Sequence, residues 1–180
     1  MPTWVSLLRA VNLGKRNKLS MPALRESLGA AGFADVRTYV QSGNIVASSP
    51  HRSPAKVAAA VHQVIADDFA MDVPVVVRSA KDMAAAIAAN PFDDAAGRPV
   101  DVHVIFLAAK PTPAAVAAFE QVELGPDKAR VIGSEVYAWY ADASRASRVD
   151  AAVRRLGVAG TARNWRTVTT LTQLAAEPRR

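Results

Sequence analysis

The sequence predicts an α+β fold built from two α/β plait units, and three observations lead to this prediction. Hydrophobic periodicity and turn residues divide residues 3–78 into strand, helix, strand, strand, helix and strand. This order is typical of the ferredoxin-like plait, in which two helices cover one face of a four-stranded sheet. From Asp101 onward the order strand, helix, strand, strand, helix begins again. Hydrophobic residues make up 51% of the 180 residues, which is enough apolar material for two small packed units.

The first expected unit spans residues 1–79. Ser20 stands where a helix N-cap belongs, with Pro22 in the first turn, and Gly32 follows the last apolar position of that helix. Gly43 and Asn44 form a hairpin turn, because both residue types tolerate positive φ. The expected elements are strand 3–11, helix 21–31, strands 36–41 and 45–47, a helix through 57–69, and strand 73–78.

The second expected unit spans residues 80–180. Gly133 and Ser134 mark another hairpin turn, Ser147 is placed to cap one helix, and Asn164 is placed to cap the last one. The expected elements are helix 80–89, strand 101–108, helix 113–120, strands 130–132 and 136–140, helix 147–156 and helix 165–175. A second plait requires a fourth strand, which has to come from 158–162, where the strand pattern is weak.

Several classes of protein are excluded or disfavoured by composition. Cysteine is absent, which excludes disulfides, thiolate metal sites and cysteine nucleophiles. His51, His62 and His103 have no second ligand at metal-site spacing, so we expect no metal and no cofactor. Neither a signal peptide nor an apolar run of about 18 residues is visible, which favours a cytoplasmic protein that does not engage a membrane.

Positive charge is concentrated at the two ends of the chain. Residues 1–20 carry four cations and no acid, and residues 145–180 carry eight arginines against two acids, in a chain of net charge +6. A basic surface assembled from both ends would attract nucleic acid or a phosphorylated molecule. The alternative is a set of scattered, solvated side chains.

The loop of residues 12–18 joins the first strand to the first helix. Gly14 permits close backbone approach, and Lys15, Arg16 and Lys18 add charge. A helix N-terminus offers unpaired N–H groups and the positive end of the helix dipole. Phosphate binding is one interpretation, although the segment matches neither a Walker loop nor a dinucleotide fingerprint. A solvated, positively charged connection is the other.

Gln41, Ser42, Gly43 and Asn44 lie at the first hairpin turn. Turn geometry accounts for Gly43 and Asn44, while the amides of Gln41 and Asn44 are also able to meet a ligand. We expect this turn at the sheet end opposite the exit of the first strand, so that Asn12 and Gln41 need not be close.

Arg163 and Arg166 flank the start of the last helix. Asn164 caps that helix, and helical spacing assigns Trp165 to the core. Two cations oppose the helix dipole at this end, an unfavourable placement unless an anion lies between them.

Aromatic residues and one histidine complete the list of candidates. Tyr137 and Trp139 share a strand face and would be able to stack on bases, but core or interface packing is the favoured interpretation. His103 and Asp101 also share a strand face, which allows either acid–base chemistry or a polar sheet face.

Four stretches of the chain resemble the signature stretches of a bacterial family of unknown function, number 1697 among such domains. They are LRAVNLG (8–14), TYVQSGNI (38–45), NPF (90–92) and TARNWRTV (161–168). The resemblance implies a cytoplasmic bacterial protein with two ferredoxin-like units, and it supplies no activity, substrate or cofactor. The motif positions that carry over are Arg9, Asn12, Gly14, Gln41, Ser42, Gly43, Asn44, Arg163, Asn164 and Trp165. Ala162 stands where we expect a hydroxyl residue in many members, and Arg166 where we expect a small polar one.

Three functions remain open at this stage. The first is a module that binds nucleic acid or a phosphorylated molecule on the basic surface. The second is an enzyme in which Arg9 and Arg163 clamp an anionic substrate and the amides of Asn12, Gln41 and Asn44 orient it. The third is an interaction subunit whose motifs are structural. The candidate binding residues are Arg9, Asn12, Gly14, Lys15, Gln41, Ser42, Gly43, Asn44, Arg163, Asn164 and Arg166.

Overall fold

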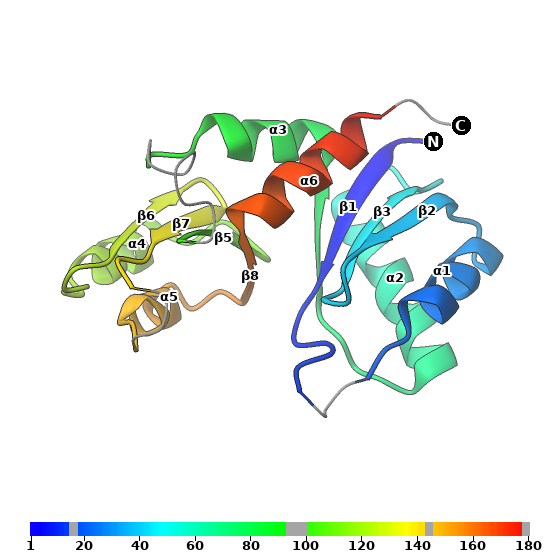
Figure 1. Cartoon of the computed structure of the whole chain (residues 1–180), viewed down its shortest axis with the longest axis horizontal. Coiled ribbons are helices and arrows are strands. Elements are labelled where there is room, and N and C mark those ends of the chain that lie inside the picture. The colour runs from blue at the N-terminus through cyan, green and yellow to red at the C-terminus, as the bar shows by residue number, and fades with distance from the viewer. Residues whose placement is uncertain (15–17, 93–100, 143–145, 178–180) are drawn as a thin grey trace. The chain divides into compact units, whose positions relative to one another are not determined.

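The structure of the chain, a computed structural model, describes residues 1–14, 18–92, 101–142 and 146–177 (Figure 1). The chain divides into two compact units: unit 1 comprises Met1–Ala85 and Thr170–Arg180, and unit 2 comprises Ala86–Thr169. Each unit contains a four-stranded sheet in which neighbouring strands are antiparallel. The predicted α+β fold with two plait units is therefore confirmed.

Unit 1 follows the plait order closely. Its elements are β1 (Thr3–Leu8), α1 (Met21–Ala30), β2 (Ala34–Tyr39), β3 (Asn44–Ser48), α2 (Pro54–Phe69) and β4 (Val75–Ser79), followed by α3 (Ala80–Ala88). The strand order in the sheet is β2-β3-β1-β4. Ser20 caps α1 as predicted, because its Oγ accepts a hydrogen bond from Ala23 N at 3.4 Å. Ser53 caps α2 in the same way.

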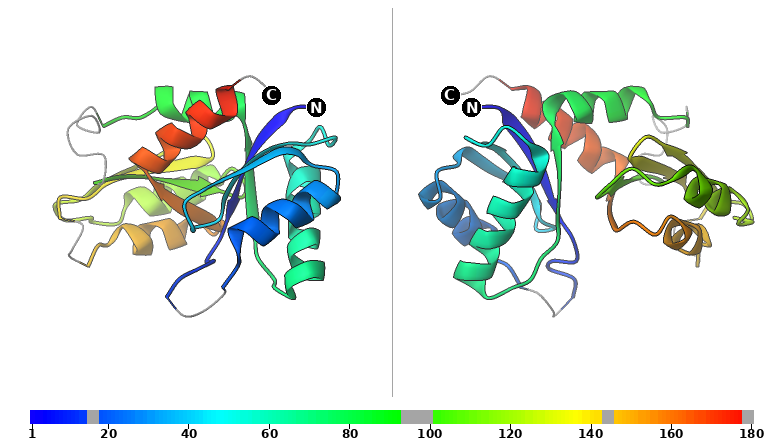
Figure 2. Two further views of the ribbon diagram at one scale, coloured as in Figure 1. Left: turned by 45° about the vertical axis from the view of Figure 1, so that its right-hand side comes forward. Right: turned by 180° about the vertical axis from the view of Figure 1, so that it is seen from behind.

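The core of unit 1 lies between its sheet and the two helices. α1 and α2 cover the same face of the sheet (Figure 2). Fully buried side chains from every layer meet there, among them Leu8, Leu24, Leu28, Ile45 and Ile65. Burial of one such side chain contributes about 1.5–3 kcal/mol, so this layer is the main source of stability in unit 1.

The hairpin between β2 and β3 adjoins the exit of β1. In the antiparallel pair of β1 and β3, Leu7 lies opposite Asn44 and Thr3 lies opposite Ser48. The end of β1 therefore meets the start of β3, and the expectation that the turn lies at the opposite sheet end is wrong. Leu8 N donates a hydrogen bond to Gly43 O at 2.8 Å, which fixes the turn against the strand exit.

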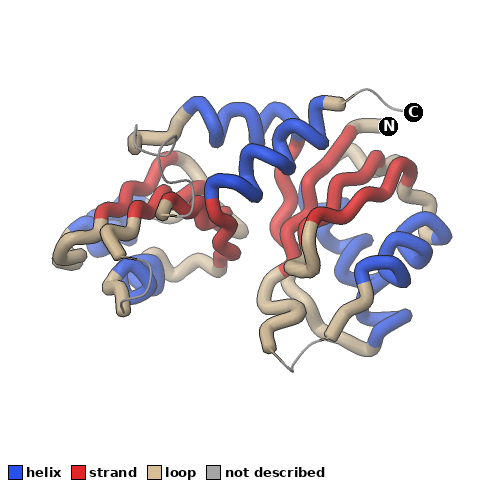
Figure 3. Tube along the Cα trace, in the orientation of Figure 1, coloured by secondary structure: helices blue, strands red, loops and turns tan. Residues whose placement is uncertain are grey.

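Unit 2 repeats the order of unit 1. Its elements are β5 (Val102–Leu107), α4 (Pro113–Glu120), β6 (Lys128–Ile132), β7 (Glu135–Trp139), α5 (Val149–Arg155) and β8 (Gly160–Asn164), followed by α6 (Trp165–Ala176). The strand order β6-β7-β5-β8 corresponds to that of unit 1. α4 and α5 pack on one face of the sheet against Ile105 and Val136. α6 follows β8 without a connecting loop, just as α3 follows β4 (Figure 3).

Two details of unit 2 differ from the sequence prediction. The fourth strand is 160–164 rather than 158–162, and it pairs with β5. Ser147 is not the N-cap of its helix: α5 begins at Val149, and Ser147 Oγ donates to Asp127 Oδ2 at 2.6 Å while it accepts from Val149 N. The predicted cap of the last helix is present, since Asn164 Oδ1 accepts from Thr167 N at 2.9 Å.

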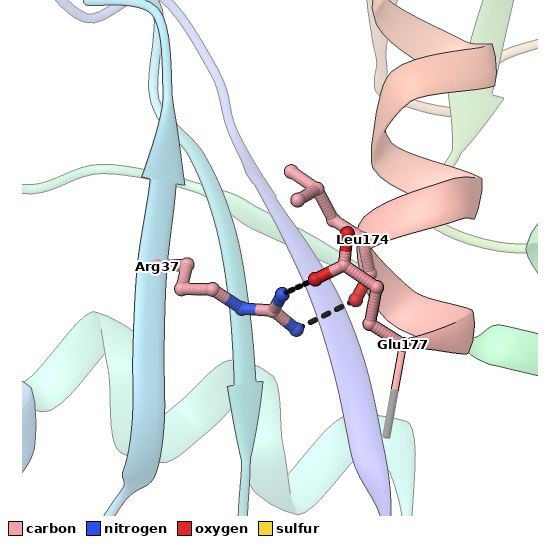
Figure 4. A network of polar contacts seen from close by, with 3 residues as sticks. All are labelled: Arg37, Leu174 and Glu177. Atoms are coloured by element: carbon pink, nitrogen blue, oxygen red, sulfur yellow. Dashed lines mark hydrogen bonds and ion pairs between the residues drawn. The ribbon is translucent and has the colours of Figure 1, made fainter. Parts of the chain in front are cut away.

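The last turns of α6 belong to unit 1. Arg37 of β2 donates from Nη2 to Leu174 O at 2.6 Å and forms an ion pair with Glu177 (Figure 4). Arg37 lies opposite Val46, on the sheet face that points away from α1 and α2. The end of α6 therefore contacts the second face of this sheet.

The end of α3 belongs to unit 2 in the corresponding way. Tyr137 of β7 lies on the face away from α4 and α5, and its Oη donates to Ala86 O at 2.7 Å. α3 and α6 thus each begin in one unit and end in the other. The sequence placed the boundary between residues 79 and 80, whereas the division in the structure passes through both helices.

Gly43 provides a test of the contact between the turn and the strand exit. A Cβ atom at this position, where φ is +74°, would lie 2.6 Å from Leu8 Cβ and 2.6 Å from Val11 Cγ2. We expect Gly43→Ala to lower the free energy of unfolding by about 3 kcal/mol, from overpacking together with left-handed strain. Chemical denaturation measures this loss.

Gly32→Ala is the matched control for that substitution. Gly32 also has a positive φ, +89°, but nothing lies within 4 Å of its added Cβ. Only the left-handed backbone then costs free energy, about 1 kcal/mol. Equal losses for the two variants would contradict the close-packing argument.

Candidate functional site

A pocket of about 480 Å³ lies where the exit of β1, the start of α1 and the β2–β3 turn meet in unit 1. We call it the β1–α1 pocket. Its volume falls within the range of small-molecule binding sites. The lining residues are Asn12, Gly14, Lys18, Leu19, Ser20 and Gln41. Three of the predicted binding residues, Asn12, Gly14 and Gln41, are therefore brought together.

The side chain of Asn12 connects two walls of the pocket through hydrogen bonds. Its Nδ2 donates to Leu19 O at 2.9 Å and to Gln41 O at 2.7 Å, while its Oδ1 accepts from Leu19 N at 2.8 Å. The side chain thereby closes the loop between β1 and α1 and ties that loop to the hairpin. Since both Nδ2 hydrogens are donated within the protein, the side chain positions the pocket walls.

Asn44 has a similar role inside the hairpin. It is fully buried, and its Nδ2 donates to Tyr39 O at 3.1 Å and to Ser42 Oγ at 3.0 Å. Ser42 and Gly43 complete the same turn. Of the three amides that the enzyme hypothesis assigned to a ligand, those of Asn12 and Asn44 are engaged in hydrogen bonds within the protein.

Gln41 and Lys18 present the accessible polar groups of the pocket. Both residues are exposed, and neither side chain makes a hydrogen bond or ion pair within the described part of the chain. The described lining contains one cation and no carboxylate. The arrangement therefore offers an ammonium group and a primary amide to an anion or a hydrogen-bonding ligand.

The start of α1 contributes less than the sequence led us to expect. Ser20 Oγ accepts from Ala23 N, Leu24 N bonds to Ser20 O, and Pro22 has no N–H. The first donors of α1 are thus largely used or missing, and the helix adds mainly the positive end of its dipole.

The cations predicted beside the pocket fall into two groups. Arg9 is exposed at the exit of β1, where its backbone N–H bonds to Pro74 O. Lys15 and Arg16 lie outside the described residues. Lys18 is a candidate from the sequence because of its charge, whereas no sequence motif marks Leu19 or Ser20 as a lining residue. The position of Ser20 as a helix cap was the available signal for it.

The arginine segment of unit 2 is placed differently. Arg163 points along β8, where its Nη1 donates to Thr161 Oγ1 at 2.7 Å and to Ala162 O at 2.8 Å. Only 8% of Arg163 is exposed, and burial lowers the pKa of its guanidinium to about 10. Asn164 is used as the cap of α6, and Arg166 is exposed on its first turn. Within unit 2, Arg163 is therefore a buried residue of the sheet.

The two aromatic residues of β7, Tyr137 and Trp139, differ in burial. Tyr137 is fully buried and hydrogen-bonded through its Oη, so the favoured packing interpretation fits it. Trp139 is half-buried, and Lys128 Nζ lies 5.0 Å from the centroid of its ring. A base-stacking role for Tyr137 would require the displacement of the end of α3.

His103 makes an aromatic contact with Tyr140. Its ring meets Tyr140 edge-to-face with centroids 5.2 Å apart, and its buried Nδ1 makes no hydrogen bond within the described residues. Burial lowers the pKa of His103, and the charge of Asp101 opposes that effect. Burial likewise raises the pKa of Tyr140 to about 12, helped by Asp150 and Asp127. Both rings are therefore neutral at pH 7.

No metal site emerges from the described residues, which contain no group of three or more histidine, aspartate or glutamate side chains able to hold an ion. Among those same residues, no helix has the length and hydropathy needed to cross a membrane.

Fold and site together define a tandem α/β plait protein with a pocket at the first strand–helix junction. The chain belongs to the family described as "Protein of unknown function (DUF1697)", whose pattern matches residues 1–137. It is also similar to the solved structure of the conserved bacterial protein SP0830 from Streptococcus pneumoniae, with a TM-score of 0.75 and 21% sequence identity. That similarity covers 98% of this chain and 99% of the other. No curated protein matches the chain.

The role of Asn12 can be tested through the amide proton that it holds. We expect Asn12→Ala to speed hydrogen exchange of the Leu19 amide at least tenfold and to lower the unfolding free energy by about 2 kcal/mol, because three hydrogen bonds are lost. Amide exchange followed by NMR measures this directly. The Leu24 amide, which bonds to Ser20 O, is the internal reference, and equal acceleration at both sites would contradict a local role.

The burial of His103 predicts a dependence of stability on pH. Because its pKa is lowered in the folded state, the unfolded chain binds more protons below pH 6.5. The free energy of unfolding should therefore fall as the pH drops through and below 6.5, and His103→Gln should reduce that slope. Urea denaturation between pH 5 and pH 8 measures the effect. A slope that is the same in the variant and the parent would rule out His103 as its source.

Proposed function

We propose that this protein binds a phosphorylated small molecule whose anionic group lies in the β1–α1 pocket. The observation that carries the proposal is the content of the described lining: the ammonium of Lys18, the amide of Gln41 and the hydroxyl of Ser20, with no carboxylate. A hydrogen bond from a charged group such as Lys18 to phosphate contributes about 1.5–3 kcal/mol, and one from a neutral group such as an amide or hydroxyl contributes about 0.5–1.5 kcal/mol.

Two further features support an anion at this position. α1 begins at the pocket, because its N-cap Ser20 is a lining residue. The positive end of a helix dipole stabilises a negative charge by about 0.3–1 kcal/mol. Arg9 is exposed near the same strand exit and adds to the positive potential. In this proposal the anion interacts with the helix dipole, with the Lys18 ammonium and with the Gln41 amide.

A small ligand is favoured over nucleic acid by the same geometry. The pocket has the volume of a small-molecule site, whereas an extended polyanion needs a row of exposed cations. Arg163, which the sequence suggested as a ligand-binding cation of unit 2, is buried in the sheet of that unit. Binding of nucleic acid on a surface built from both basic ends of the chain remains the alternative, and it predicts strong loss of affinity with salt.

Binding is favoured over catalysis by the kind of groups present. The described lining holds no imidazole or carboxylate to transfer a proton. The proposal therefore assigns the pocket to recognition. We also propose a cytoplasmic location in a bacterium, supported by the bacterial origin of the similar structure.

Lys18→Ala tests the proposal. We expect the variant to bind inorganic phosphate and pyrophosphate about tenfold more weakly than the parent protein, because a charge-assisted contact is lost. Isothermal calorimetry at low salt measures both affinities. Short single-stranded RNA at low and moderate salt tests the alternative in the same instrument.

Lys56→Ala is the matched control. Lys56 lies in the first turn of α2, which Ser53 caps as Ser20 caps α1, but it does not line the pocket. It should leave phosphate affinity unchanged. Equal weakening by the two substitutions would show that only net charge attracts the anion and would remove the pocket from the proposal.

A further inference from the structure

Two exposed apolar side chains flank the β1–α1 pocket. Leu13 is 66% exposed and Val40 is 53% exposed. Within the described part of the chain, the only other exposed large hydrophobic residue is Met1. Leu13 stands between the lining residues Asn12 and Gly14, and Val40 immediately precedes Gln41. Exposed apolar surface is thus concentrated beside the pocket.

The two side chains come from segments that are held together. Asn12 Nδ2 donates to Gln41 O at 2.7 Å, so the residue after Asn12 and the residue before Gln41 both start from this junction. Leu13 and Val40 are not lining residues themselves, but the Cα atom of each is only about 3.8 Å from the Cα atom of a lining residue. We call these two residues the apolar rim.

The backbone of Val40 adopts a conformation that is unfavourable for its side chain. Val40 has a φ of +50°, a region that is unfavourable for a β-branched residue by roughly 1–2 kcal/mol. Glycine or asparagine would adopt this conformation with less strain. The side chain gains little burial in return, because more than half of it is exposed. Strained backbone of this kind is concentrated at active sites and at positions that hold a ligand.

We infer that the ligand of the β1–α1 pocket is an organic phosphate with an apolar body, which rests on Leu13 and Val40 while its phosphate lies at Lys18 and Gln41. This inference rests on the proposed function and adds the chemical class of the ligand. The apolar rim would bury a ring or short alkyl group, and the pocket would bind the charged end.

A phospholipid membrane also presents phosphate groups next to apolar chains. The structure favours a small organic phosphate over such a membrane surface. Two side chains bury much less apolar area than a single myristoyl chain, which by itself gives only marginal membrane binding. The phosphate-binding groups also lie in a pocket rather than on a flat face. The ligand is therefore a small molecule rather than a bilayer.

The experiment compares two probes, inorganic phosphate and phenyl phosphate, by calorimetry on the full chain. We expect phenyl phosphate to bind about tenfold more tightly, because partial burial of a ring on the rim adds hydrophobic stabilisation. In Leu13→Ser and Val40→Asn this preference should fall to about twofold, with the affinity for inorganic phosphate unchanged.

Val40→Asn carries a second readout and has a matched control. Asparagine tolerates the left-handed backbone, so we expect the variant to melt at a higher temperature while it loses its preference for phenyl phosphate. Ala70 has the same kind of backbone, with a φ of +51°, at the C-terminal end of α2. Ala70→Asn should raise the melting temperature similarly and leave both affinities unchanged.

The possible failures are distinguishable. Equal binding of the two probes, or an unchanged preference in both rim variants, would overturn this inference while the proposed function stands. Absence of binding by both probes, or phosphate binding that Lys18→Ala does not weaken, would overturn the proposed function and this inference with it. Tight binding to phosphatidylglycerol vesicles without a preference for phenyl phosphate would assign the rim to a membrane and overturn the inference.

Discussion

The close approach of the β2–β3 turn to the exit of β1 is the constraint on which unit 1 depends. Gly43 lies so near Leu8 and Val11 that a side chain has no room at its position, and its carbonyl accepts the Leu8 N–H. This contact fixes the register of β3 against β1, since a slip by one residue would turn every side chain of β3 to the other face. The same approach brings Gln41 to Asn12 and so forms one wall of the β1–α1 pocket.

Most of the fold could be predicted from the sequence because local signals agree with the tertiary structure. Ser20 is both a favourable cap and the residue after a polar loop, and the apolar residues of α1 and α2 recur at helical spacing. β8 was harder to predict, because Thr161 is its only β-branched residue and its conformation is stabilised by pairing with β5. That α3 and α6 each begin in one unit and end in the other could not be predicted from any local pattern. It depends on contacts between distant residues, such as that of Arg37 with Leu174.

The candidate site was predictable in its residues and less so in their roles. The polar loop and the turn identified Asn12, Gly14 and Gln41, but the hydrogen bonds of Asn12 follow from a pairing between distant strands that the sequence does not specify. Arg163 was expected at a surface because it is charged, whereas its place in the alternation of β8 buries it. Leu13 is an apolar residue in a polar loop, and this is the one feature of the apolar rim that the sequence contains. The exposure of Val40 could be known only from the structure.

The contact of Arg37 with the end of α6 has a consequence for the order in which the chain is completed during translation. Its hydrogen bond to Leu174 O spans 137 residues, so β2 leaves the ribosome long before its partner is made. Domains generally fold as units while synthesis proceeds from the N-terminus. While unit 2 is synthesised, the sheet of unit 1 therefore lacks the contact between Arg37 and the end of α6. A polypeptide that stops short of residue 174 therefore lacks the contact that Arg37 makes with the end of α6.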